Sequence, residues 1–424
     1  MKTNLQVFAA IKEETIWLTD LRMKWAEKWQ TLAPPVFEKV AFHRWNLTDE
    51  MIQANYGEEL INSQQYQYES TENAKIVQYG TETMMEQLPQ EMLDQGVIFT
   101  DFFTAMTDYP ELVEKHFMTQ AVKVDENQLT AYHAAYLNSG VFIYIPKNIE
   151  VQLPLEALFV QNGFRKEAFN KHVLLVADES SSVTYVEKMI TEGTVENSAT
   201  IIVEVIAKAG ARVKYSAIDH LSEQTTAYLN RRGHVAKDAS IDWAIGMMSN
   251  GNMICDFDSD LIGDGSSSTI KAIGISTGRQ IQGINTRVTN TGKHSVGHIL
   301  QHGVILDRST LTFNGVGHIK KGAKGADAQQ ESRVLMLSES ARGDANPILL
   351  IDENEVKAGH AASGGRVDDE EMFYLLSRGI PEAEAQRLVI RGFLGTVIKA
   401  IPLKDMRDEL IEMIDQKLIR TDCK

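Results

Sequence analysis

Cysteine is scarce in this sequence. Only Cys255 and the near-terminal Cys423 occur among 424 residues, and no Cys-x-x-Cys pair is present. A disulfide framework is therefore excluded, and a reducing compartment, the cytoplasm, is predicted. No apolar run approaches the roughly 18 residues that a membrane-spanning helix needs. The first residues lack a small-residue cleavage site, which argues against a signal peptide.

Nucleotide-binding and hydrolase motifs are also missing. The sequence has no G-x-x-x-x-G-K-[ST] phosphate-binding loop, and no G-x-G-x-x-G is placed to open a helix after a strand. The serine run at residues 266–268 does not form a G-x-S-x-G nucleophile elbow. These motifs therefore supply no catalytic constellation.

Basic residues are outnumbered, 42 against 58 acidic ones, which gives a net charge of −16. A surface this negative repels phosphate backbones, so nucleic acid and anionic membranes are not expected partners. The content of 43% hydrophobic and 24% charged residues is typical of a soluble globular protein. The length allows about three domains.

The chain begins with a helical pattern. Apolar residues recur there at three- and four-residue steps and define one helix face: Leu18, Leu21, Trp25 and Trp29. The prolines at 34 and 35 end this helix. An extended piece is expected at residues 75–79, and further helical patterns at 82–93 and 101–118. Residues 1–125 are predicted to form an α-rich N-terminal domain.

From about Ala134 the hydrophobic period changes from 3.6 residues to 2. No helix-length pattern stands between the predicted strands, which argues against a doubly wound α/β fold. The strands are short, rich in β-branched residues and separated by Gly, Asp, Asn or Ser. They lie at residues 141–145, 173–176, 183–186, 201–206, 213–218, 241–245 and 270–275.

Related turns precede several strands, roughly every 26–30 residues. They lie at residues 177–180, 207–210, 236–239 and 262–265. This spacing fits one coil of a parallel β-helix, in which each coil stacks on the next and alternate residues point inward. From periodicity alone a β-sandwich is an equally good interpretation. Residues 126–365 are assigned to this β core.

Helical periodicity returns beyond Gly365, with helices predicted at residues 369–378, 381–391 and 403–419. Asp368 suits the N-cap of the first, because its carboxylate can accept hydrogen bonds from backbone N–H groups of the first turn. This C-terminal domain, residues 366–424, is too short to form a large core of its own. We expect it to pack on the β region or on another protein.

Three histidines stand at four-residue steps, at His294, His298 and His302. On a strand the outer two would lie ~26 Å apart, so they could not share one metal ion, and hydrogen-bonded or surface histidines are expected. The alternating carboxylates of Asp256, Asp258 and Asp260 are interpreted as a solvated strand face. Cys255 is interpreted as a buried structural thiol.

His360 stands among Ala, Gly and Ser residues that are too small to bury it. An imidazole in such surroundings is open to a ligand or a partner. An exposed loop histidine and a ligand histidine are both compatible with this sequence.

The last third of the chain resembles a known family. The run VKAGHAASG, followed by DEEMFYLLSRGIPEAEAQRLVIRGF, resembles the C-terminal signature of the SufD branch of the SufB/SufD family, subunits of the SUF iron–sulfur cluster assembly machinery. Shorter upstream motifs fall in the order that this family shows: His294-Ser295, Gln301-His302-Gly303-Val304, Phe313-Asn314-Gly315 and Asp327-Ala328-Gln329-Gln330. Weaker similarity reaches back through residues 138–155 to Pro35 and Trp45.

The resemblance implies a mainly β fold, with a right-handed parallel β-helix core flanked by the α-rich N-terminal domain and the small helical C-terminal domain. It implies a non-catalytic scaffold that pairs with SufB through the β-helices, and a homodimer in the absence of SufB stays open as an alternative. His360 matches a histidine that contributes to a nascent cluster site at this interface. No cofactor is expected to stay bound to the chain alone; the nascent iron–sulfur cluster is transient.

The resemblance also implies that the C-terminal helices dock the SufC ATPase. The candidate contacts are Phe373, Tyr374, Leu375, Ile380, Leu388, Ile390 and Phe393, which are equally compatible with internal packing. One departure is Ala358, where many SufD sequences carry cysteine, so no thiolate can come from that position. Two alternatives stay open, a SufB-type scaffold that holds a cluster itself and a carbohydrate-active β-helix protein.

Overall fold

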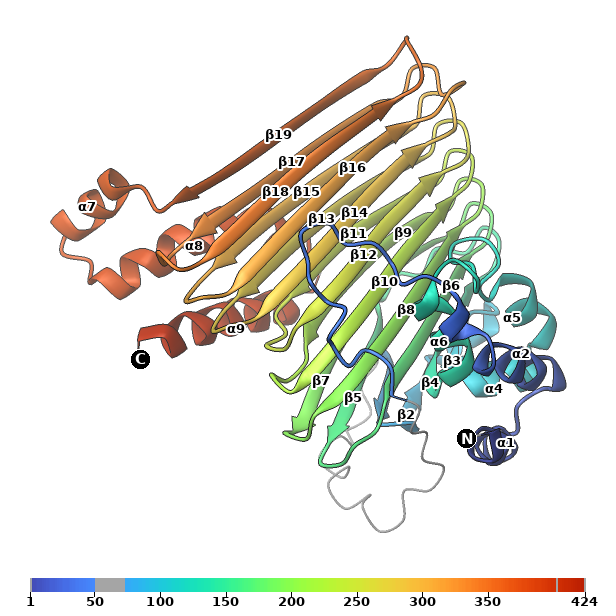
Figure 1. Ribbon diagram of the computed structural model, residues 1–424. Helices are drawn as coiled ribbons and strands as arrows, with labels where there is room; N and C mark the ends of the chain where they lie inside the picture. The colour runs from blue at the N-terminus through green and yellow to red at the C-terminus, as the bar shows by residue number, and fades with distance from the viewer. Residues whose placement is uncertain (1, 50–72, 402, 423–424) are drawn as a thin grey trace.

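The computed structural model describes residues 2–49, 73–401 and 403–422. Among these residues, two sheets form most of the molecule, one of ten strands and one of nine (Figure 1). The first contains β1(Ala74–Tyr79), β2(Glu82–Gln87), β5(Leu155–Gly163), β7(Ser182–Gly193), β9(Arg212–His220), β11(Ser240–Met247), β13(Ser267–Ser276), β15(Val296–Ile305), β17(Asp327–Met336) and β19(Lys357–Arg366). The second contains β3(Ile98–Asp101), β4(Ser139–Ile145), β6(Phe169–Ala177), β8(Asn197–Ala207), β10(Thr225–Val235), β12(Met253–Leu261), β14(Ile281–Asn290), β16(Thr310–Ile319) and β18(Arg342–Ile351).

From β4 onward the chain alternates between the two sheets, and every strand pairs in parallel with the strand two further along. Each pair of strands is therefore one coil of a parallel β-helix with about 8 turns. Paired residues in neighbouring coils are separated by one coil length. Ala227 pairs with Met253, 26 positions later, and Thr310 pairs with Arg342, 32 positions later.

The interior of the β-helix is a continuous apolar core between the two sheets. One inward-facing row of the ten-stranded sheet shows how it is built, because residues in register stack directly on one another. Tyr185 is in register with Tyr215, which is in register with Trp243, and all three side chains are buried. Their rings contact at centroid distances of 5.3 and 4.8 Å.

Equivalent turns stack on one another along one corner of the β-helix. Each contains a residue with positive φ, glycine in some coils and Ser180, Asp238 or His294 in others. The backbone N–H of that residue donates to a carbonyl of the next coil, as Asp238 does to Asp264 and His294 to Lys324, both at 2.9 Å. The repeat seen in the sequence is therefore this stacked turn, and His294 is one of its members.

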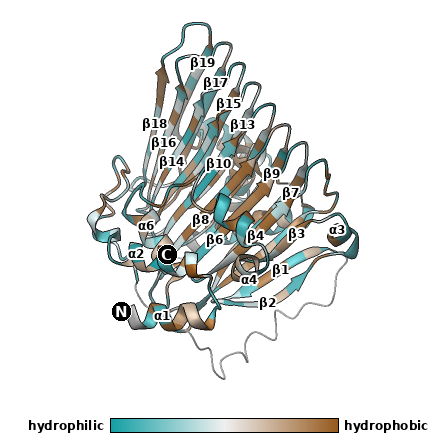
Figure 2. Ribbon diagram, turned by 90° about the vertical axis from the view of Figure 1, so that its right-hand side faces the viewer, coloured by the Kyte–Doolittle hydropathy of each residue, from teal (hydrophilic) through white to brown (hydrophobic). Residues whose placement is uncertain are grey.

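The N-terminal helices cover the outer face of the nine-stranded sheet at its first coils (Figure 2). They are α1(Lys2–Ile11), α2(Ile16–Ala26), the 3-10 turn η1(Trp29–Thr31), α4(Phe102–Asp108), α5(Pro110–His116) and α6(Gln128–Tyr136); α3(Gln90–Asp94) packs into the β-helix core through Met92. After η1 an extended strap, residues 32–48, crosses the same sheet face. Its Phe37, Val40 and Phe42 pack on Tyr228 and Ile254.

The C-terminal helices are α7(Asp369–Ser377), α8(Glu382–Ile398) and α9(Lys404–Asp422). The last two lie on the outer face of the ten-stranded sheet, where Leu394 and Leu410 pack against Ile218, Ile273 and Val304. The carboxylate of Asp368 accepts from the N–H groups of Glu370 and Glu371, so it is the N-cap that the sequence predicted. Within the described part of the chain, no helix is both long and apolar enough to cross a membrane.

The predicted class, a mainly β chain with a parallel β-helix core and helices at both ends, is confirmed. The helix predicted at residues 82–93 is wrong in its first half, because residues 82–87 form β2, antiparallel to β1. The boundaries at residues 125 and 365 stay predictions. Strand β1, which precedes the first boundary, pairs with β5 of the β-helix.

Candidate functional site

His360 lies in β19, the last strand of the ten-stranded sheet, and its side chain is exposed. Its register partner is Gln330 of β17, and the row continues downward through Ile299, Ile270 and Trp243. All of these side chains point into the β-helix and are buried. His360 is therefore the terminal member of an inward-facing row, at the mouth of the β-helix interior.

Polar side chains replace the aliphatic core just below this mouth. Gln330 donates its Nε2 to the carbonyl of Ile348 at 2.8 Å, which links the two sheets across the interior. Its Oε1 is buried and has no hydrogen-bond partner among the described residues. Ser332 donates to Gln301 at 2.9 Å. The unused acceptor thus belongs to the register partner of His360, on the neighbouring strand.

Small residues surround His360 on its own strand. Ala358 and Ala362 are its inward-facing neighbours, two positions away on either side, because successive side chains of a strand alternate between faces. Ala358 packs on the small apolar cluster of Ile319, Ala326 and Ala328. A thiolate at position 358 would stand on the same face as His360, and alanine leaves that place without a ligand.

The coil that carries His360 leaves the β-helix open. Within the residues that the structure describes, no strand pairs with the outer edge of β18 or of β19. Leu350 and Ile351 of β18 are each 46% exposed. Unpaired backbone groups on two adjacent edges are a template for strands of another chain.

An asparagine ladder runs along the outer face to this edge. Asn314 donates to Asn285 at 3.0 Å, and Asn346 of β18 donates to Asn314 at 2.9 Å. Lys39 of the N-terminal strap donates to Asn346 Oδ1 at 2.6 Å and so covers the end of the ladder. The strap therefore helps to hold the last coil in register.

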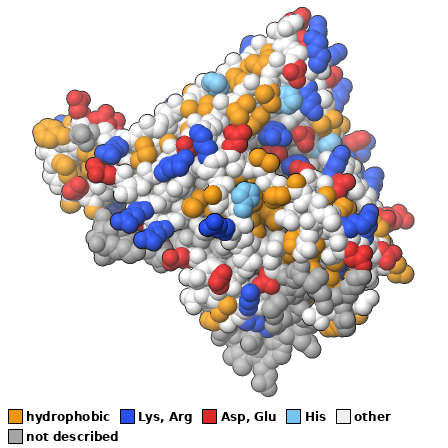
Figure 3. All heavy atoms as spheres, viewed as in Figure 1, with side chains coloured by type: hydrophobic (Ala, Val, Ile, Leu, Met, Phe, Trp, Pro, Cys, Tyr) orange, Lys and Arg blue, Asp and Glu red, His pale blue; other side chains and the backbone are white. Residues whose placement is uncertain are grey.

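The candidate contacts on the C-terminal helices differ in exposure. Phe373 and Tyr374 of α7 are 72% and 57% exposed, and Leu388 of α8 is 42% exposed. Figure 3 shows hydrophobic side chains at the surface of the lobe on its left, where Figure 1 places α7. Leu375, Ile380 and Phe393 are half-buried, and Ile390 is fully buried in the core beneath α8.

A groove of about 400 Å³ lies between α7, the start of α8 and the β17–β18 turn. Phe373 and Leu376 line it together with Met336, Leu337 and Met372. Leu376, 41% exposed, was not among the sequence-derived candidates. Its spacing of three residues from Phe373 on one helix face is the signal that could have included it.

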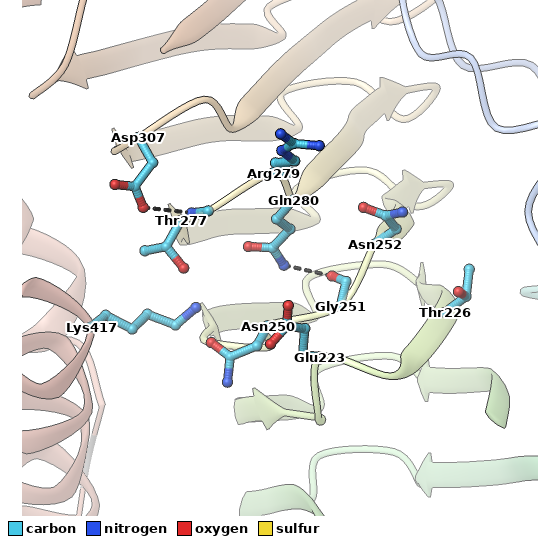
Figure 4. A pocket seen from close by; sticks show the side chains of 11 residues that line it. Glu223, Thr226, Asn250, Gly251, Asn252, Thr277, Arg279, Gln280, Asp307 and Lys417 are labelled. Atoms are coloured by element: carbon cyan, nitrogen blue, oxygen red, sulfur yellow. Dashed lines mark hydrogen bonds between the residues drawn. The ribbon is translucent and has the colours of Figure 1, made fainter. Parts of the chain in front are cut away.

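A second hollow, of about 360 Å³, lies where α9 meets the turns of four coils (Figure 4). Lys417 of α9 is buried and donates to the carbonyls of Ser249 and Ile275 at 2.9 and 3.2 Å. Gln280 donates to the carbonyl of Gly251 at 2.6 Å. We interpret these contacts as the attachment of α9 to the β-helix.

The other sequence candidates do not form a site together. The described residues contain no group of three or more His, Cys, Asp or Glu side chains placed to hold a metal ion. The predicted solvated face of Asp256, Asp258 and Asp260 is wrong at Asp258, which is buried and paired with Arg232 at 3.0 Å, whereas Asp256 and Asp260 are half-buried. Asp256 accepts from Asn285 at 3.0 Å. Cys255 is fully buried, and burial raises the pKa of its thiol.

The fold defines a class of protein, a parallel β-helix with helices at both ends, and among the described residues the edges of its last coil are unpaired. Comparison with models of known protein families assigns this chain to one of them. The model of the SufBD core domain of SUF system FeS cluster assembly matches residues 159–393, and that of the SufBD N-terminal region matches residues 18–157. The chain belongs to the SufBD family.

Named relatives agree with this assignment. The iron-sulfur cluster assembly protein SufD of Bacillus subtilis is 43% identical over 98% of this chain and 97% of its own length. Iron-sulfur cluster assembly SufBD family proteins of Staphylococcus saprophyticus and Staphylococcus aureus are each 25% identical over 93% of this chain and 88% of theirs.

Proposed function

We propose that this chain is a non-catalytic scaffold subunit for iron–sulfur cluster assembly, working in the cytoplasm in a complex with SufB and the SufC ATPase. The observation that carries the proposal is the place of His360, at the end of an inward-facing row and at the mouth of an open β-helix. A ligand there faces both this chain's interior and any chain that caps it. Family membership supplies the cargo, a nascent iron–sulfur cluster.

An imidazole is a suitable iron ligand beside thiolates, as mixed Cys/His clusters show. This chain offers no thiolate at the mouth, because position 358 is alanine and the one described cysteine, Cys255, is buried inside the β-helix. The sulfur ligands would therefore come from SufB. This favours a shared site over a SufB-type scaffold that holds a cluster itself.

The edges of β18 and β19 support pairing with SufB. Each strand is ten residues long and presents one free row of backbone donors and acceptors, so an added strand on each sheet would extend both. The exposed Leu350 and Ile351 would be buried in the same contact. A second copy of this chain has the same edges, so a homodimer is expected when SufB is absent.

The exposed apolar residues of α7 and α8 support docking of SufC. Phe373, Tyr374, Leu376 and Leu388 would form the contact, with the groove beside α7 as the receiving surface. We leave Ile390 out of this contact because it is fully buried beneath α8. Aromatic side chains at the centre of an interface contribute most of its binding energy.

A carbohydrate-active β-helix protein would need two accessible carboxylates flanking a sugar-binding groove. The carboxylates of Glu187 and Asp219 lie inside the β-helix, and both are bonded to Arg231. They are therefore unavailable to a polysaccharide.

Iron and acid-labile sulfide on the co-purified three-protein complex test the proposal. We expect His360→Ala to assemble normally and to carry several-fold less iron and sulfide than the wild type. His318→Ala is the matched control, since His318 is paired with Asp352 at 3.1 Å on the outer face and does not line the mouth. Equal loading in all three proteins would make His360 a surface residue and this subunit purely structural.

A further inference from the structure

A pocket of about 340 Å³ lies on the outer face of the ten-stranded sheet, beside the connection between α8 and α9. Its floor is formed by β9, β11 and β13, and its wall by residues 399–401 and the first turns of α9. Four basic side chains line this basic pocket, against one carboxylate, that of Asp242. The four are Lys214 of β9, Lys271 of β13, Lys399 at the C-cap of α8 and Arg407 of α9.

The register of the three strands fixes where the floor lysines stand. Lys214 is in register with Asp242 of β11, and Lys271 is in register with Ala244, two positions further along β11. Both positions point outward, because the side chain of Trp243 between them is buried in the β-helix core. The two lysines therefore stand on opposite sides of β11, and the methyl group of Ala244 leaves the space between them open.

The charges in the basic pocket are not neutralised from within the chain. The side chains of Lys214, Lys271 and Lys399 make no hydrogen bond or ion pair with any residue that the structure describes, and neither does that of Asp242. Arg407 donates its Nη1 to the carbonyl of Ile401 at 2.7 Å, which fixes its guanidinium at the wall.

Four cations and one carboxylate leave three positive charges unbalanced in one hollow. Like charges held together repel one another, and a hollow lined by one sign of charge concentrates its field on ions of the opposite sign. In a chain whose net charge is −16, this local excess of positive charge is the reverse of the overall balance. A bound anion would remove the repulsion.

We propose that the basic pocket binds the diphosphate group of a small molecule. Two linked phosphate groups carry several negative charges at neutral pH and offer acceptor oxygens to all four side chains, whereas one carboxylate would leave most of the charge unbalanced. Ammonium and guanidinium groups are the usual donors to phosphate, and the volume lies at the small end of ligand pockets.

The same lining indicates which part of the ligand is recognised. The aromatic residue in the lining, Trp243, directs its ring into the β-helix core and not into the pocket, so it is not available to stack on a nucleobase. The pocket therefore recognises the diphosphate itself, whether free or carried by a nucleotide. This site does not depend on the proposed scaffold function.

Calorimetric titration of the full-length chain with pyrophosphate, near neutral pH and at low ionic strength, tests the site. We expect one pyrophosphate per chain, and Lys214→Gln and Lys271→Gln should each weaken binding about tenfold, because each removes a charge-assisted hydrogen bond. Neither side chain bonds to another described residue, so both variants should keep the wild-type melting temperature. The matched control is Lys147→Gln, whose exposed pair with Glu179 does not line the pocket.

A change of the opposite sign separates a built site from general surface charge. Asp242→Asn removes the carboxylate from the lining and should tighten binding several-fold, whereas Glu179→Gln should leave it unchanged. Absence of pyrophosphate binding in the wild type would overturn the proposal. Equal weakening by Lys147→Gln and Lys271→Gln would also overturn it, since any loss of positive charge would then have the same effect.

Inorganic phosphate, AMP and ADP distinguish the sources of the diphosphate. Phosphate and AMP carry a single phosphate group and should bind about tenfold more weakly than pyrophosphate. ADP binding no tighter than pyrophosphate would identify the free anion as the ligand, and tighter binding of ADP would identify a nucleotide. AMP binding as tightly as pyrophosphate would contradict a diphosphate site. None of these titrations needs SufB, SufC or a cluster, so their outcome is independent of the loading assay on His360→Ala.

Discussion

Arg231 provides a demanding test of the β-helix interior. It lies on β10 with its guanidinium in the core, where it donates to Asp219 of β9 at 2.8 and 2.6 Å and to Glu187 of β7 at 2.9 Å. All three side chains are fully buried. Tyr185 donates to the other oxygen of Glu187 at 3.2 Å. The cluster joins the two sheets across the interior.

Arg231→Met introduces a side chain of similar volume but removes the positive charge. The carboxylates of Glu187 and Asp219 then stay in the core without their cation. Breaking a buried ion pair by removing one partner costs about 3–5 kcal/mol of unfolding free energy. The exposed pair of Arg212 and Glu150, at 2.7 Å, is the matched control, and Arg212→Met should cost less than about 1 kcal/mol. Urea denaturation followed by circular dichroism measures both.

The loss in Arg231→Met should depend on pH. Burial already raises the pKa of Glu187, and removal of the cation raises it further. When folding raises the pKa of a carboxyl group, the unfolded chain loses the proton at a lower pH than the folded chain, so the folded state loses stability as pH rises toward the folded pKa. The loss of unfolding free energy in Arg231→Met should therefore be larger at pH 8 than at pH 5. Replacing Glu187 and Asp219 by Gln and Asn in the same protein should recover much of the loss. A defect below 1 kcal/mol at pH 8 would refute this account of the core.

Three further predictions concern other parts of the molecule. Burial raises the pKa of Glu204 from 4.5 to about 8, so the wild type should lose stability as pH rises through this window, and Glu204→Gln should flatten the dependence of melting temperature on pH. Gly265→Ala should lower the unfolding free energy by about 1–2 kcal/mol, because φ is +70° and a Cβ would lie 2.3 Å from Oδ1 of Asp238. His294→Gly, where φ is +55°, should be neutral or stabilising in the same denaturation assay. Phe373→Ser should weaken SufC binding at least tenfold in calorimetry without lowering the melting temperature, since the side chain is 72% exposed.

The strands that could be predicted from the sequence are those with alternating β-branched residues. All seven predicted strands fall within β4, β6, β7, β8, β9, β11 and β13. Strand β10 was missed because its inward row includes Arg231, and a charged residue in a core position breaks the expected pattern. The cluster that neutralises this charge joins residues 44 positions apart, which no local pattern reveals.

Of the later strands, the sequence indicated only the apolar run at residues 348–351, which lies in β18, and the others were missed for a different reason. Toward the open end the inward residues become small or polar, as in β19, where Ala358, His360, Ala362 and Gly364 occupy the inward positions. The sequence suggested a polar loop there. The repeat could have corrected this, because His360 stands 30 positions after Gln330, one coil length. Its exposure was predictable from its small neighbours, but its direction into the β-helix required the register.

The most direct test of the central claim asks whether His360 itself binds iron. Only this chain is labelled with ¹⁵N-histidine, the complex with unlabelled SufB and SufC is loaded with iron and sulfide, and the reduced cluster is examined by pulsed electron paramagnetic resonance. The account predicts a hyperfine coupling from a directly bonded ¹⁵N nucleus, present in the wild type and in His318→Ala and lost in His360→Ala. A loaded cluster without that coupling in the wild type would contradict it.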